Sequence, residues 1–133
     1  MSAGIGPHNA LMLDMFGDLA ASAWGATAYQ VGSSLTSETW RDVDVRVLVE
    51  HHEFLRMFYD PTGGGRSWNV ADRLSEPSWK AHMLAWSKLG EALTGLPIDF
   101  QVEPIDEANE RYPNEPRSAL GTRAAQQEER TNG

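Results

Sequence analysis

Residues 42–49 read DVDVRVLV, and this stretch decides the fold. Valine occupies positions 43, 45, 47 and 49, and Asp42, Asp44 and Arg46 stand at the alternate positions. An alternation of period two that is rich in β-branched residues predicts a β-strand whose valines enter the core. Residues i and i+2 of a strand share a face, so we expect Asp42, Asp44 and Arg46 to project together from the other side.

The segments before this strand predict a helix and a second strand. Apolar residues at helical spacing indicate an amphipathic helix that begins at Pro7 or His8 and ends at Trp24. Residues Ala26–Val31 form a short strand-like run, and the polar residues Ser34–Arg41 predict a loop.

The segments after it predict two helices and a third strand. Residues His51–Tyr59 can form a helix, and the Pro- and Gly-rich run that follows predicts an irregular loop over Asp60–Asn69. A second helix opens at Pro77 and stops at Gly95, and Ile98–Val102 predicts a strand.

This order of elements predicts an α/β or α+β fold, in which helices pack on one side of a small mixed sheet. We expect the 42–49 strand to be central and to neighbour the 98–102 strand. A chain of 133 residues has room for one core. We therefore expect one domain over residues 1–121, and the polar residues 122–133 predict a disordered tail.

The charge of the chain limits its partners. The formal net charge is −8, with 11 Lys and Arg residues against 19 Asp and Glu residues, so a long nucleic acid is not an expected partner. A free nucleotide remains compatible with this charge when a metal ion neutralises both sides. The chain has no cysteine, which excludes disulfides, thiol catalysis and thiolate zinc sites. No run is apolar enough to cross a membrane, and we expect a cytoplasmic protein.

Three features of the sequence indicate a site that could bind an anion and a metal ion. Gly32 and Ser33 follow a predicted strand, and a turn of this kind lets a backbone approach an anion closely. Asp42 and Asp44 repel each other on one strand face unless a cation lies between them. Asp99 is flanked by apolar residues, which places a third carboxylate on the polar face of its strand. Taken singly, each feature has a plain structural explanation. The Gly-Ser pair fits a turn, the Asp-x-Asp pair fits a solvated strand face, and Asp99 fits a carboxylate at a strand edge.

Taken in order, these features resemble the polymerase-β nucleotidyltransferase superfamily. That family has a strand ending in Gly-Ser, an Asp-x-Asp strand and a carboxylate on a later strand, and the resemblance covers residues 8–103. More narrowly, residues 41–46 and 94–101 look like small nucleotidyltransferase-like proteins of phages and actinobacteria. The chain departs from many relatives in its short link between Ser33 and Asp42, in Arg41, which replaces a serine, and in lacking a helical acceptor-binding domain after the third strand.

The resemblance implies transfer of a nucleoside monophosphate from a nucleoside triphosphate, with ATP expected, to a hydroxyl of a protein or small molecule. Two Mg²⁺ or Mn²⁺ ions would bind Asp42, Asp44 and Asp99, and Asp99 could take up the acceptor proton. Gly32 and Ser33 would hold the β- and γ-phosphates. Apart from the resemblance, the Pro- and Gly-rich composition of residues 60–69 predicts a loop that is mobile and becomes ordered over a bound nucleotide, and a plain flexible insertion is the alternative.

The sequence leaves two questions open, which are the role of Arg46 and the class of function. Arg46 could reach a phosphate or the acceptor, or it could pair with a neighbouring carboxylate. The alternatives to an active enzyme are a catalytically weak or inert nucleotide- or partner-binding module that keeps the fold, and an interaction protein whose carboxylates are incidental.

Overall fold

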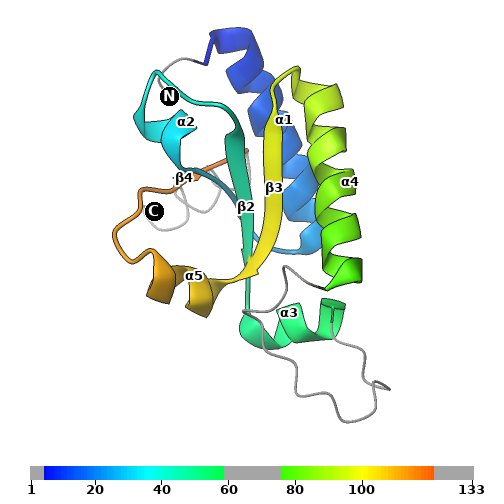
Figure 1. The fold of residues 1–133 in the computed structure, drawn as a ribbon. Helices are drawn as coiled ribbons and strands as arrows, with labels where there is room; N and C mark the ends of the chain where they lie inside the picture. The colour runs from blue at the N-terminus through cyan, green and yellow to red at the C-terminus, as the bar shows by residue number, and fades with distance from the viewer. Residues whose placement is uncertain (1–4, 59–75, 122–133) are drawn as a thin grey trace, which may run out of the picture.

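A computed structural model describes residues 5–58 and 76–121, which form one four-stranded sheet with strand order β3-β2-β1-β4 (Figure 1). The strands are β1 (Ala28–Val31), β2 (Val43–Val49), β3 (Ile98–Pro104) and β4 (Ser118–Ala119). Strand β2 pairs with β3 in parallel, whereas β1 is antiparallel to both of its neighbours. The predictions of a mixed sheet and of a 42–49 strand beside the 98–102 strand are confirmed.

Two long helices, α1 (Pro7–Trp24) and α4 (Pro77–Thr94), lie together on one side of the sheet (Figure 1). Each has proline in its first turn, where no helical partner for an N–H is needed, and each ends at a glycine in the left-handed conformation. The helices run antiparallel, because Asn9 near the start of α1 donates a 2.9 Å hydrogen bond from Nδ2 to the carbonyl oxygen of Thr94 at the end of α4.

The core lies between this helix pair and the sheet. Val45 and Val47 of β2 are fully buried, and the rings of Phe16 from α1 and Phe100 from β3 meet edge to face at 5.8 Å. Trp79 of α4 is also buried and donates a 3.0 Å hydrogen bond from Nε1 to the carbonyl oxygen of Val102. These contacts fix α4 along β3, which is the strand that carries Asp99.

The structure differs from the sequence predictions in three short elements. Residues Ser33–Thr36 form helix α2, although Ser34–Arg41 were expected to form a loop, and the buried Ser34 of this helix accepts a 3.1 Å hydrogen bond from Gln30 of β1. Helix α5 (Ile105–Arg111) and strand β4 were not predicted. A helix of this length that buries only Ala108 shows no apolar periodicity.

The boundaries of other elements also shift. Strand β1 begins two residues later than predicted, β2 begins at Val43, after Asp42, and β3 continues to Pro104. Helix α3 (His51–Phe58) follows β2 as expected. The predicted 60–69 loop and the 122–133 tail lie outside the described residues. Within the described part of the chain, no helix is both long and apolar enough to cross a membrane.

Candidate functional site

The polar residues of the site stand on the two parallel strands at the centre of the sheet. The β2–β3 register pairs Asp44 with Asp99, and Arg46 with Gln101. Val45, between the two polar positions of β2, is fully buried against the helices. Because successive side chains alternate between faces, Asp44 and Asp99 lie on the same open face of the sheet, as expected.

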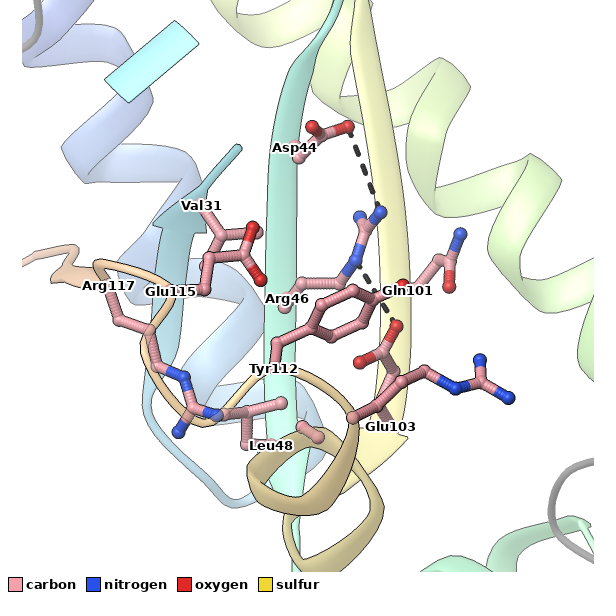
Figure 2. A pocket seen from close by; sticks show the side chains of 11 residues that line it. Val31, Asp44, Arg46, Leu48, Gln101, Glu103, Tyr112, Glu115 and Arg117 are labelled. Carbon is pink, nitrogen blue, oxygen red and sulfur yellow. Dashed lines mark ion pairs between the residues drawn. The ribbon is translucent and has the colours of Figure 1, made fainter. Parts of the chain in front are cut away.

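The guanidinium of Arg46 occupies the middle of this face (Figure 2). Its Nη2 lies 3.3 Å from Asp99 Oδ2 and 3.8 Å from Asp44 Oδ1, and its Nε lies 3.3 Å from Glu103 Oε1. Its Nη1 donates hydrogen bonds of 2.7 Å to the carbonyl oxygen of Asp99 and 3.1 Å to that of Val45. The side chain is only 14% exposed, so Arg46 is a fixed positive charge among three carboxylates.

The end of β1 packs directly on Asp44. Val31 pairs with Asp44 across the antiparallel strands, and Gly32 follows with a φ of 77°. A Cβ atom at Gly32 would overlap Oδ2 of Asp44. The positive φ, at a ψ of −162°, and the close approach to Asp44 both require glycine at this position. The predicted Gly-Ser turn and the Asp-x-Asp strand therefore meet in space.

Asp42 and Ser33 extend the site beyond the strand ends. Asp42 was predicted to lie within the strand, but it is exposed and precedes β2. Together with Ser33 and Asp44 it lines a cavity of about 300 Å³ beside α2. Five of the six predicted site residues thus surround Asp44: Gly32, Ser33, Asp42, Arg46 and Asp99.

The Asp44 carboxyl has a perturbed acidity. Burial raises its pKa from the ordinary 3.8 to about 6, the charge of Arg46 opposes the rise, and the charges of Asp99 and Asp42 add to it. Removal from water disfavours the charged form, and neighbouring negative charges disfavour it further. An additional cation beside Asp44 would therefore stabilise the charged form of this carboxylate.

The carboxylates do not enclose a complete metal site. Across residues 5–58 and 76–121, no three acidic or histidine side chains are grouped closely enough to hold a metal ion. Within this part of the chain the guanidinium of Arg46 is the positive charge that contacts both Asp44 and Asp99.

A larger cleft of about 350 Å³ continues from Asp44 along the same face (Figure 2). Its floor comes from β2 and β3, and its wall comes from α5 and the segment after it, including Tyr112, Glu115 and Arg117. These wall residues were not predicted as site residues, since nothing in their sequence indicates that the chain turns back over the sheet. Glu103 could have been found, because it stands four residues after Asp99 on the same strand and shares its face.

No protein-family model, curated protein or solved structure matches this chain. The resemblance to nucleotidyltransferases therefore stays a prediction that rests on the residues and their arrangement.

Proposed function

We propose that the chain is a metal-dependent nucleotidyltransferase that moves a nucleoside monophosphate from ATP or another nucleoside triphosphate to a hydroxyl acceptor. The observation that carries the proposal is the meeting of three segments at one carboxylate. Gly32 packs on Asp44, Asp99 pairs with Asp44 across the strands, and Asp42 lines the same cavity as Asp44.

The donor chemistry suits Mg²⁺ or Mn²⁺. Both are hard cations that prefer carboxylate and hydroxyl oxygens, and Asp42, Asp44 and Asp99 offer such oxygens on one side of the sheet. When bound, two ions would neutralise the triphosphate and activate the attacking hydroxyl. The raised pKa of Asp44 supports this assignment, because a carboxylate in that state gains stability from a neighbouring cation.

The protein groups have separate tasks in this proposal. The bare backbone of Gly32 and the hydroxyl of Ser33 hold the phosphates next to Asp44. Asp99 is 43% exposed and accepts the proton of the acceptor hydroxyl. Arg46 keeps its contacts with Glu103 and the carbonyl oxygen of Asp99. Its pair with Asp44 is, at 3.8 Å, the longest of its three ion pairs, and this pair would give way to a cation bound at Asp44.

A second candidate is an inert nucleotide- or partner-binding module. It is favoured by the same arginine, since the guanidinium of Arg46 already neutralises Asp44 and Asp99 without any metal ion. In this case Arg46 is a permanent replacement for the cation, and the three aspartates keep the fold's shape without turnover.

The test is incubation of the full chain with each α-labelled nucleoside triphosphate and Mg²⁺ or Mn²⁺. Pyrophosphate release, or transfer of label to the protein or to an added hydroxyl compound, is expected for the wild type and lost in Asp44→Asn and Asp99→Asn. Glu53→Gln is the matched control, because Glu53 lies on α3, where it pairs with Arg56 and contacts none of the three aspartates. Nucleotide binding without turnover would support the inert nucleotide-binding module. No binding of metal or nucleotide would reject the enzyme and the nucleotide-binding module, and would leave only the partner-binding form of the second candidate.

A further inference from the structure

The cleft that continues from Asp44 contains a hydroxyl group of the protein itself. Among the described residues that line this cleft, Tyr112 is the one whose side chain ends in a hydroxyl. Tyr112 is 49% exposed, so this hydroxyl is accessible to a ligand bound in the cleft. The proposed function requires a hydroxyl acceptor, and the cleft brings one to the sheet face that carries Asp44 and Asp99.

The backbone of Tyr112 is held over the sheet by contacts on both sides of it in the sequence. Tyr112 ends α5, where its N–H donates a 3.0 Å hydrogen bond to the carbonyl oxygen of the buried Ala108. Its own carbonyl oxygen accepts a 3.3 Å hydrogen bond from the N–H of Glu115, and the chain then returns to the sheet, where Ser118 of β4 pairs with Gln30. The backbone is therefore fixed, while the half-exposed side chain can change rotamer.

The side chain of Tyr112 is directed along the cleft toward β3. Figure 2 shows its ring in front of Arg46, with the outer end of the ring on the side of Gln101. Gln101 follows Asp99 by two residues on the same face of β3, which is a step of about 7 Å at about 3.3 Å per residue. A change of rotamer moves the end of a tyrosine side chain by several ångströms, so the hydroxyl can reach the carboxylates.

We propose that Tyr112 is a site of self-modification, at which the chain attaches one nucleoside monophosphate to its own phenolic oxygen. The inference rests on the proposed function and names its acceptor. The phenolic oxygen attacks the α-phosphorus of the nucleoside triphosphate and forms a new P–O bond. The bond from this phosphorus to the oxygen that bridges to the β-phosphate breaks, and pyrophosphate leaves with the electron pair. The phenolic proton passes to the carboxylate of Asp99.

The surroundings of Tyr112 suit the product of this reaction. Arg111 precedes Tyr112 and Arg117 belongs to the same wall, and both line the cleft. A phosphodiester on Tyr112 keeps a negative charge, which guanidinium groups neutralise through charge-assisted hydrogen bonds. The cleft volume of about 350 Å³ lies within the range of small-ligand sites, which is about 300–1,000 Å³. The attached nucleotide would occupy the cleft, so the reaction should stop after one transfer per chain.

Incubation of the full chain with each α-labelled nucleoside triphosphate and Mg²⁺ or Mn²⁺, followed by mass spectrometry, tests the proposal. The wild type is expected to gain the mass of one nucleoside monophosphate, and peptide fragmentation is expected to place it on Tyr112. Tyr112→Phe should lose the label, because it keeps the ring and removes the acceptor oxygen. Tyr29→Phe is the matched control and should keep the label, because Tyr29 lies on the same sheet face, opposite Arg46, but does not line the cleft.

The outcomes distinguish failure of this inference from failure of the proposed function. Label at another residue, or pyrophosphate release without labelled protein, overturns the assignment of Tyr112 and leaves the proposed function in place. A rate of labelling per chain that rises with protein concentration overturns the step within one chain. Absence of both pyrophosphate and label with every nucleoside triphosphate overturns both proposals. Label that persists in Asp44→Asn also overturns both, because it would form without the proposed site.

Discussion

Replacement of Asp44 by asparagine should stabilise the metal-free protein at neutral and alkaline pH. The difference between the ordinary pKa of 3.8 and the value of about 6 in the folded chain corresponds to about 3 kcal/mol, at about 1.36 kcal/mol per pKa unit. Asparagine keeps the shape of the side chain and removes the charge that burial disfavours. At pH 8 we therefore expect Asp44→Asn to have a free energy of unfolding about 3 kcal/mol above that of the wild type.

The raised pKa also predicts how the difference in stability between the wild type and Asp44→Asn varies with pH. A carboxyl whose pKa is raised by folding contributes its full stability below the unfolded pKa, and this contribution is lost as the pH rises through the folded pKa. The two proteins should thus be equally stable below about pH 4 and diverge between about pH 4 and pH 6. Urea unfolding at pH 4, 6 and 8 with a chelator present measures this.

Addition of metal and nucleotide should close most of this difference in stability. Mg²⁺ or Mn²⁺ with a nucleoside triphosphate is expected to stabilise the wild type by about 2.7 kcal/mol when the ligand concentration is 100 times the dissociation constant. The free energy of unfolding of Asp44→Asn should not change. Glu38→Gln is the control, because Glu38 is exposed in the segment between α2 and β2 and should change stability by less than about 0.5 kcal/mol. A less stable Asp44→Asn at pH 8, or a difference that does not vary with pH, would refute the reasoning.

Two further substitutions test the packing that positions the site. Gly32→Ala should destabilise the fold by more than Gly25→Ala, since both glycines have positive φ but only Gly32 has the Asp44 carboxylate in the way; the positive φ alone costs about 1–3 kcal/mol. Equal losses in urea unfolding would contradict the close approach. Trp79→Phe should cost about 1–3 kcal/mol, because it removes the hydrogen bond to Val102 and leaves a cavity, while metal binding should be unaffected. A loss below about 0.5 kcal/mol would show that this contact contributes little.

The sequence predicted the elements whose pattern is periodic. Strand β2 was evident from the valines of residues 42–49, and α1 and α4 from their apolar spacing and their terminal proline and glycine residues. Helix α2 could not be predicted, because a polar helix of four residues has no apolar periodicity, and its buried Ser34 is paired with Gln30 only through the folded structure.

The residues of the candidate site were predicted better than their contacts. The strand period placed Asp44 and Arg46 on one face, but it could not say which carboxylates the guanidinium reaches. That depends on the register of β3, which puts Asp99 opposite Asp44 and brings Glu103 to the other side of Arg46. The cleft wall from α5 depends on a tertiary contact and leaves no periodic signal in the sequence.

The parallel pairing of β2 and β3 determines when the site can exist during synthesis of the chain. Asp44 and Asp99 belong to strands that neighbour each other in space, yet the whole of α3 and α4 is made between them. Contacts between such distant positions require closure of a long loop, which slows folding. The hairpin partner β1 can join β2 early, because a short link connects them. The carboxylate pair, in contrast, is completed only after synthesis has passed β3, so the nascent chain has a core strand long before it has a candidate active site.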